Sequence, residues 1–214
     1  MRRLTQLPRL TDIVKTRVAL RALAAGLLTL AGVPAAACAA AWPPPGPTAT
    51  GSIRGRVVVE GVRPAPVLLR VTRDRRFCGD EKISPRLTLA PDGGVQGAVL
   101  IVEGLEASVR GPGAGEVLVD NRGCEFIPHV QTAIVGQTLV LRNSDPFLHT
   151  AHVYLDDRRT WFNLALPAWR RPIRRRLERP GLLRIECNVH AWKWAFVYVS
   201  PHPFASVTDA SGRF

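Results

Sequence analysis

The chain has 214 residues, 46% of them hydrophobic, which is enough for one domain with a tail or for two small domains. Its formal net charge is +12, because 29 lysines and arginines outnumber 17 acidic residues. No aromatic-basic recognition motif accompanies this charge, so we expect no nucleic-acid partner. No Ser-His-Asp set, pair of carboxylates, phosphate-binding loop or haem-attachment motif stands out either, so we expect no enzymatic activity.

Residues 1–41 have the pattern of a secretory signal peptide. Basic residues come first, an Ala- and Leu-rich apolar run follows over residues 18–41, and several Ala-x-Ala cleavage points lie between residues 35 and 41. The sequence therefore predicts export, to the periplasm of a bacterium or to another oxidising compartment.

Two other interpretations of this segment stay open. A membrane anchor is disfavoured because Arg21 and Pro34 interrupt the apolar run. A lipoprotein signal that ends at residue 37 would leave Cys38 lipidated, and this is the one way in which we expect the chain to be attached to a membrane.

After the signal, the chain has the pattern of a β protein. A Pro-rich linker over residues 42–50 precedes short β-branched or alternating runs, separated by turn sequences at residues 91–94 and 120–123. We expect no long helix, and residues 144–180 have the least regular pattern, with room for a helical turn. Many short strands at this spacing predict an all-β Greek-key sandwich. The predicted strands are residues 53–60, 67–72, 86–90, 98–103, 116–120, 138–142, 182–187 and 195–200.

The cysteine count fits an exported chain. Of four cysteines, Cys38 is removed with the signal or lipidated, which leaves Cys78, Cys124 and Cys187. An odd number predicts one disulfide and one free thiol. If Cys187 is a metal ligand, Cys78 and Cys124 form the disulfide.

Two short motifs about forty residues apart indicate a metal site. Asn143 ends one predicted strand and His149 begins the next, while Cys187 ends a later strand and His190 follows in the loop. In a Greek-key sandwich these loops can lie at the same end, so His149, Cys187 and His190 would surround one point. Two imidazoles and a thiolate are the ligands of type-1 copper sites. We expect Asn143 to hydrogen-bond across to the Cys187 loop and fix the ligands.

These residues resemble the cupredoxins, the family of plastocyanin and azurin. Within that family, they resemble a group of exported bacterial plastocyanin-like or methylamine-utilisation-type proteins, which join a copper fold to a carboxypeptidase-regulatory-like β segment. Their motif Asn-x-Asp-x-x-x-His-Asn is matched by Asn143–Thr150, with Thr150 in place of Asn, and Cys-x-x-His-x-Trp-Met by Cys187–Lys193 except at its end. Residues 124–130 and 204–214 also resemble segments of that group.

The resemblance implies a domain organisation from residue 51 onward. Residues 51–200 would form a cupredoxin-type Greek-key sandwich with extra N-terminal strands. Residues 201–214 would begin a truncated C-terminal β unit.

The resemblance also implies a function. A copper ion bound by His149, Cys187 and His190 would make the chain a periplasmic one-electron carrier, and its partner would be an acidic redox protein such as a cytochrome or an oxidoreductase. The arginine-rich stretch 170–176 would be a docking patch for that partner or a solvated loop. Trp192, if exposed beside His190, would add an apolar contact surface.

One departure from the family pattern changes this expectation. The axial methionine of the family falls on Lys193, and Met1 is the only methionine of the chain. The axial ligand is therefore absent or atypical, and an ammonium at this position would favour the reduced metal. The alternative functions are a copper-binding module without redox traffic and a metal-free structural or interaction domain.

The three remaining histidines are expected to be structural, while an outer-shell role for His152 and a second metal site at His129 stay open as alternatives. His152 lies three residues after His149, so strand alternation sends the two side chains to opposite faces. His129 follows Pro128, and His202 lies in a loop between two prolines.

Overall fold

The computed structural model describes residues 51–105, 113–156, 158–169 and 171–214. The predicted signal peptide and Pro-rich linker, residues 1–50, lie outside the described residues. Within the part that is described, no helix is long and apolar enough to cross a membrane.

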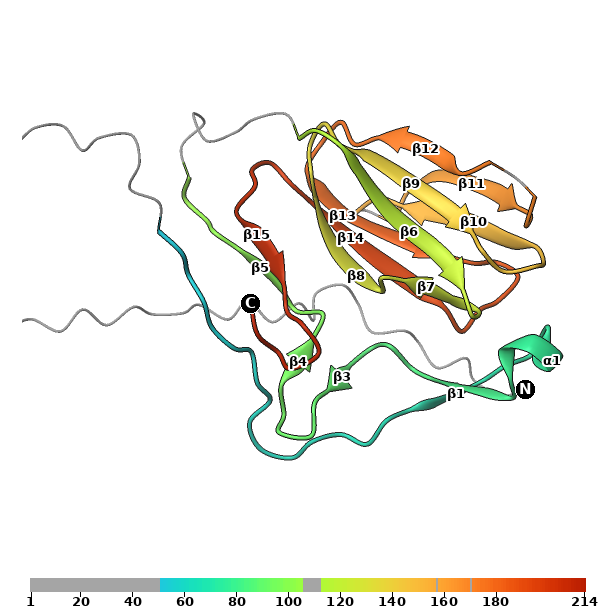
Figure 1. Cartoon of the computed structure of the whole chain (residues 1–214), viewed down its shortest axis with the longest axis horizontal. Helices are drawn as coiled ribbons and strands as arrows, with labels where there is room; N and C mark the ends of the chain where they lie inside the picture. The colour runs from blue at the N-terminus through green and yellow to red at the C-terminus, as the bar shows by residue number, and fades with distance from the viewer. Residues whose placement is uncertain (1–50, 106–112, 157, 170) are drawn as a thin grey trace, which may run out of the picture. The chain divides into compact units, whose positions relative to one another are not determined.

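Two sheets pack face to face as a sandwich (Figure 1). Nine strands in two layers form this part of the chain. The first sheet has the order β11 (Thr160–Leu166), β10 (His149–Tyr154), β13 (Gly181–Glu186), β14 (Trp194–Ser200) and β8 (Val130–Ile134). The second has the order β12 (Ile173–Arg176), β9 (Thr138–Asn143), β6 (Glu116–Arg122) and β7 (Glu125–Ile127).

The strand order is that of a Greek-key fold, because the chain repeatedly changes sheet. It passes from β8 to β9 in the opposite sheet and then back to β10. Two pairs, β6 with β9 and β14 with β8, are parallel, while the other pairs of the sandwich are antiparallel. The predicted all-β sandwich with extra N-terminal strands is confirmed.

Strand alternation builds the core and directs the first histidine of the site inward. Alternate residues of β10 are buried, beginning with His149 and continuing through Ala151 and Val153. Ala151 and Val153 belong to the main hydrophobic core together with side chains of the second sheet. The fully buried members of this core include Val119, Leu139, Leu141, Leu166, Ile185 and Val197.

The prediction for residues 144–180 was wrong. This stretch contains β10, β11 and β12 and no helical turn among its described residues. The last two strands lie at sheet edges, so their sequences lack a clean apolar alternation: β12 has one buried residue, Ile173, followed by three exposed arginines.

Two smaller predictions also need correction. The turn expected at residues 120–123 begins later, because β6 continues to Arg122 and the chain reverses at Gly123 and Cys124, whose φ angles are 62° and 64°. The strand expected over residues 53–60 is reduced to isolated bridges at Arg56 and Val58.

The N-terminal extension, residues 51–105, contains short elements: β1 (Leu68–Arg70), α1 (Arg75–Cys78), β2 (Glu81–Ile83), β3 (Thr88–Leu89), β4 (Val95–Gln96) and β5 (Val99–Ile101). The last strand of the chain, β15 (Ala205–Val207), pairs with β5, and Arg213 forms a bridge with Arg56. The end of the chain therefore pairs with the extension rather than with the sandwich. The predicted disulfide between Cys78 and Cys124 is present and connects α1 to the turn between β6 and β7.

Candidate metal centre

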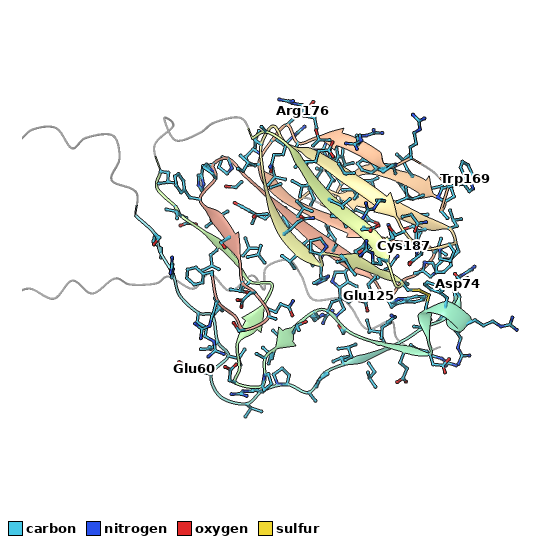
Figure 2. The ribbon with its side chains drawn as sticks, viewed as in Figure 1. Glu60, Asp74, Glu125, Trp169, Arg176 and Cys187 are labelled. Carbon is cyan, nitrogen blue, oxygen red and sulfur yellow. A yellow bond between two sulfur atoms is a disulfide. The ribbon has the colours of Figure 1, made fainter. Side chains whose placement is uncertain are left out.

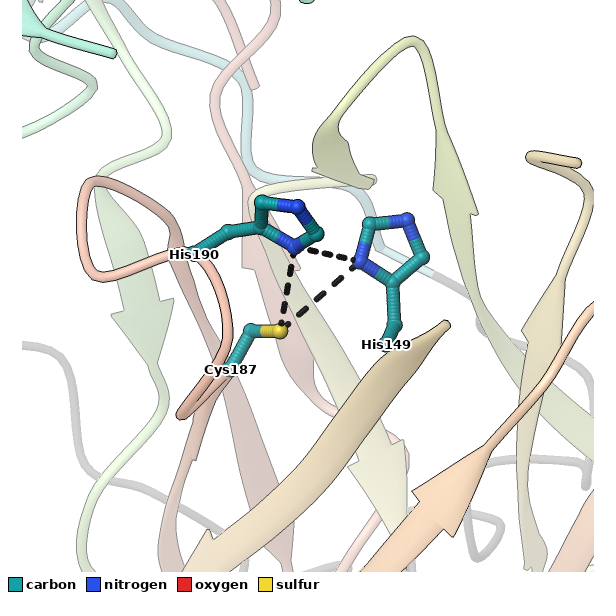
Figure 3. Close-up of side chains that lie close together, drawn as sticks. All are labelled: His149, Cys187 and His190. Carbon is teal, nitrogen blue, oxygen red and sulfur yellow. Dashed lines mark hydrogen bonds between the residues drawn. The ribbon is translucent and has the colours of Figure 1, made fainter. Parts of the chain in front are cut away.

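The three predicted ligands meet at one end of the sandwich (Figure 3). His149 begins β10, Cys187 directly follows β13, and His190 lies in the loop before β14. Nδ1 of His149 lies 2.8 Å from Nδ1 of His190, and Sγ of Cys187 lies 3.7 Å and 3.5 Å from these two nitrogens. All three side chains are buried, so the donor atoms converge in a site shielded from water.

Two carboxylates orient the imidazole rings. Nε2 of His149 lies 2.9 Å from Oδ2 of Asp145, and Nε2 of His190 lies 2.8 Å from Oδ2 of Asp74. Because a carboxylate only accepts, each Nε2 carries a hydrogen and donates it, which directs each Nδ1 toward the sulfur. The two Nδ1 atoms lie 2.8 Å apart, so both face the same point. The donor set and its orientation fit a soft metal ion.

Asp74 was not predicted from the sequence, and Asp145 was placed at the site by its motif but was given no role. Asp145 carried a signal, because it lies four residues before His149 within the Asn-x-Asp motif. Its carboxylate also accepts hydrogen bonds from the backbone N–H groups of Gly123 and Cys124. Burial raises the pKa of Asp145, but the bonds from Cys124, His149 and Gly123 outweigh burial and hold the pKa below its usual range.

The sulfur of Cys187 is prepared to be a thiolate. Burial raises the pKa of the thiol, but the imidazoles of His149 and His190 and the charge of Lys193 lower it to about 4. The backbone N–H of Thr150 adds a contact of 3.4 Å to the sulfur. Since the thiolate is the form that binds metals, Cys187 is a competent ligand near neutral pH.

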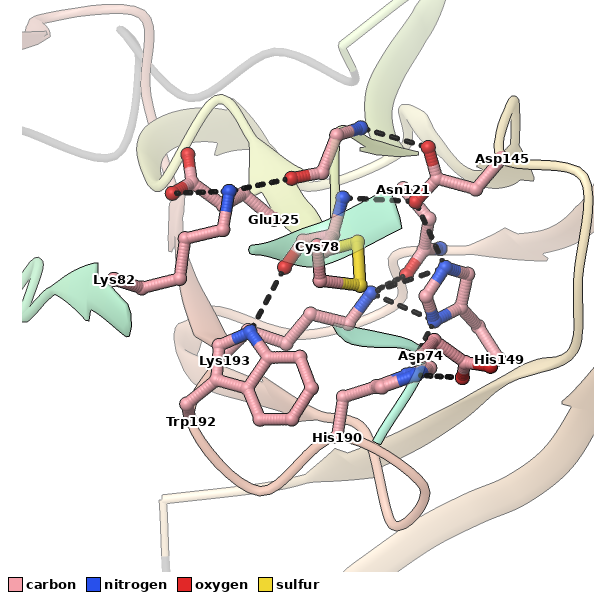
Figure 4. The surroundings of a disulfide bond; sticks show 12 residues. Asp74, Cys78, Lys82, Asn121, Glu125, Asp145, His149, His190, Trp192 and Lys193 are labelled. Carbon is pink, nitrogen blue, oxygen red and sulfur yellow. Dashed lines mark hydrogen bonds and ion pairs between the residues drawn. A yellow bond between two sulfur atoms is a disulfide. The ribbon is translucent and has the colours of Figure 1, made fainter. Parts of the chain in front are cut away.

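Lys193 lies against the ligand group, with only 3% of its surface exposed (Figure 4). Its Nζ donates to Oδ1 of Asn121 at 2.7 Å and lies 2.9 Å from Nδ1 of His149. It also lies 4.7 Å above the ring of Phe126. Burial lowers the pKa of Lys193 to about 8, although the charges of Cys187 and Asp145 oppose this shift. A buried amine thus lies beside the ligands, where the sequence placed the axial position.

The remaining contacts differ from those expected. Asn143 does not reach the Cys187 loop: its amide donates to the carbonyls of Phe147 and Leu166, and its oxygen accepts from the N–H of Asp145. It therefore shapes the turn that carries Asp145. The link to the Cys187 loop comes from Thr150, whose hydroxyl oxygen accepts the N–H of Asn188 at 2.7 Å.

Trp192 is a packing residue. Only 5% of its surface is exposed, so the exposed contact surface that we considered beside His190 is not formed by this side chain. Its indole N–H donates to the carbonyl of Cys124, and its ring packs against His190 with centroids 4.9 Å apart.

The other histidines stay outside the ligand group. His152 points to the opposite face of β10 from His149 and stacks on Tyr154, with centroids 4.0 Å apart. Nδ1 of His129 donates to the carbonyl of Trp194, and burial lowers the pKa of its ring. His202 is buried and bonds to Ser200.

The chain is similar to several solved structures. No family model matches the chain, and no curated protein matches it. The M98A mutant of amicyanin in the Cu(I) form is 17% identical over 39% of this chain and 81% of that chain, with a TM-score of 0.34. A purple cupredoxin from Nitrosopumilus maritimus is 20% identical over 41% of this chain and 100% of its own, with a TM-score of 0.35.

A Cu-containing nitrite reductase from Thermus scotoductus SA-01 is 22% identical over 45% of this chain and 27% of its own, with a TM-score of 0.34. Because these TM-scores are below 0.5, we assign the fold class from the strand order of this chain and the site from its own side chains.

Proposed function

We propose that this chain is an exported copper-binding protein with a type-1-like centre that carries single electrons. The convergence of His149, Cys187 and His190, whose ligand atoms all lie within 4.8 Å of one another in a buried site, carries this proposal. A thiolate with two imidazoles is the donor set of electron-transfer copper sites. Cations that prefer oxygen ligands, such as Mg²⁺ and Ca²⁺, have no suitable donors in this group.

The chain holds the three ligands in place and shields them from water. The rings of His149 and His190 are fixed by carboxylates, and Cys187 is fixed by the contact from Thr150. When bound, copper would supply one-electron redox chemistry. Lys193 takes the place of a thioether, so the centre is three-coordinate or has an atypical fourth ligand.

The proposal extends to a partner and a compartment. Edge strand β12 exposes Arg174, Arg175 and Arg176, which would attract an acidic redox protein such as a cytochrome or an oxidoreductase. The signal-like residues 1–41 support an exported protein, periplasmic in a bacterium. Electron transfer to a partner, rather than catalysis, is the activity that we assign.

A second candidate function is metal-free or non-redox, and one observation favours it. Nζ of Lys193 lies 2.9 Å from Nδ1 of His149. An ammonium there uses the lone pair that a metal ion needs. In this alternative, the chain is a structural or interaction domain, or it holds copper without exchanging electrons.

Copper titration of the full chain separates these functions. We expect one copper per chain and an intense visible absorption band that disappears on reduction and returns on oxidation. Cys187→Ser and His149→Ala should lose the band, while His152→Ala, which removes a histidine from the other face of the same strand, should keep it. Stoichiometric copper without a reversible band would favour the non-redox module, and no bound copper would favour the metal-free domain.

A further inference from the structure

The N-terminal extension reaches the candidate metal centre. Asp74, which precedes α1, lies beside the site, and Figure 2 shows Asp74 and Cys187 at the same end of the sandwich. Oδ2 of Asp74 lies 2.8 Å from Nε2 of His190, across 116 positions of sequence. His190 is fully buried, so its outer ring edge is covered by this segment and its neighbours instead of facing water.

A disulfide and a small packed cluster hold this segment in place. The disulfide joins Cys78 to Cys124, and Cys124 also donates its N–H to Asp145, the carboxylate that holds the other histidine. Around the disulfide, Val71 and Trp192 complete a small buried cluster separate from the main core. The disulfide therefore connects the segment that carries Asp74 to the turn that binds Asp145 (Figure 4).

A pair of aromatic rings joins the segment to the turn that precedes His149. Phe77 packs edge-on against Phe147, with ring centroids 5.1 Å apart. Phe147 in turn lies 5.1 Å from the ring of His149 and 5.7 Å from that of His190. The covering segment therefore contacts the loops of both imidazole ligands.

The backbone at Asp74 is held in an uncommon conformation. Its φ of 51° and ψ of 34° are left-handed, which costs free energy for a residue other than glycine. Its carbonyl accepts from the N–H groups of Phe77 and Cys78, both at 2.9 Å, while its side chain forms no capping bond within α1. The turn thus leaves the carboxylate free for His190.

We propose that residues 74–78 form a disulfide-tethered cap over the metal centre, in which Asp74 is a positioning residue for His190. The cap fixes the ring so that Nδ1 faces Cys187, and it closes the His190 side of the site to solutes. The part of this inference that concerns metal retention rests on the proposed function, whereas the shielding of Cys187 and the orientation of His190 do not.

The first test uses the metal-free full chain and the reactivity of the Cys187 thiol. Iodoacetamide modification is followed by peptide mass mapping, which separates Cys187 from Cys38. We expect Cys187 to react at least tenfold faster in the Cys78→Ser/Cys124→Ser variant than in the wild type, once circular dichroism shows that the sandwich is folded. Equal rates in the two folded proteins would overturn the shielding.

The second test measures the orientation of His190 and keeps the disulfide intact. In the wild type, the Nε2 hydrogen of His190 should give an exchange-protected imidazole signal in NMR spectra. Asp74→Ala should lose this signal, and Asp74→Asn, which keeps an acceptor oxygen, should retain it. Asp80→Ala is the matched control, because Asp80 lies in the same extension but pairs with Arg75 on the surface. A protected signal in Asp74→Ala would overturn the positioning role.

The third test measures metal retention. Asp74→Ala should bind copper about 10–100-fold more weakly than Asp80→Ala, the range observed when such supporting groups are removed. Unchanged affinity would overturn the role of the cap in holding metal. If the wild type binds no copper, the proposed function fails. The alkylation and NMR results would still show whether residues 74–78 shield Cys187 and orient His190.

Discussion

Nζ of Lys193 lies 2.9 Å from Nδ1 of His149, the same atom that lies 2.8 Å from Nδ1 of His190. The amine therefore contacts the ligand group directly, and the side chain is almost fully buried. Two unit charges 4 Å apart interact by about 4 kcal/mol at an effective dielectric constant of 20. A charged Lys193 should thus weaken copper binding, and it should weaken binding of the divalent ion more than that of the monovalent ion.

Replacing Lys193 by methionine should increase copper affinity. The substitution keeps an unbranched chain of similar length and removes the ammonium, so we expect at least about tenfold tighter binding of copper(II) and a smaller gain for copper(I). Competition with chelators of known affinity measures both. Arg176→Met is the matched control, because Arg176 is an exposed cation of edge strand β12 and its loss should leave both affinities unchanged. Equal gains for the two oxidation states would contradict the electrostatic explanation.

Asp145→Asn should destabilise the metal-free protein by about 1–3 kcal/mol. The carboxylate accepts from Gly123 through one oxygen and from Cys124 and His149 through the other. An amide has only one acceptor oxygen, so at least one buried donor loses its partner. Urea denaturation measures the change, and Asp80→Asn, at an exposed surface position, should shift the midpoint little. A similar midpoint for the two variants would show that these bonds contribute little.

Local motifs, an assumed Greek-key connection and a family resemblance together predicted the ligand group. The proximity of Cys187 and His190 follows from a Cys-x-x-His spacing within one loop, which is a short-range feature. The approach of His149, 38 positions before Cys187, was inferred from the Greek-key connection and from the family resemblance. The position of His152 on the opposite face follows from strand alternation. The sandwich class follows from the same periodicity repeated over many short strands.

The long-range contacts of the site could not be predicted in this way. Asp74 contacts His190 because the chain folds back over the sandwich, and no periodicity connects two residues 116 positions apart. Asn143 was given the wrong partner because its amide is used within its own turn. Strand β12 was missed because three of its four residues are arginines, which at a solvent-exposed edge leave no alternation to detect.

Stability should fall as the pH falls below about 6.5, and His129 should account for part of this loss. Burial lowers the pKa of His129 below 6.5, against the opposing effects of the Trp194 carbonyl and the charge of Glu125. The unfolded chain then binds a proton more readily than the folded one, so this contribution is complete above the unfolded pKa and declines toward the folded pKa.

Urea midpoints measured between pH 7.5 and pH 5.5 test this effect. The wild type should lose stability across this interval, and His129→Gln should lose less, because its side chain does not titrate. His152→Gln keeps His129 and should retain its contribution. An identical slope for wild type and His129→Gln would assign the pH dependence to other groups.

The Cys78–Cys124 disulfide should contribute about 2–4 kcal/mol to the free energy of unfolding, because it closes a loop across 46 positions and restricts the unfolded chain. The buried cluster around it is small: Val71, Cys78, Cys124 and Trp192, with Leu69 and Phe147 packed against them. The sandwich has its own larger core and should stay folded without the bond. Urea denaturation of Cys78→Ser/Cys124→Ser should show a lower midpoint, and the reduced wild type should match it. An oxidised wild type no more stable than the double variant would mean that native contacts, and not the cross-link, hold the extension in place.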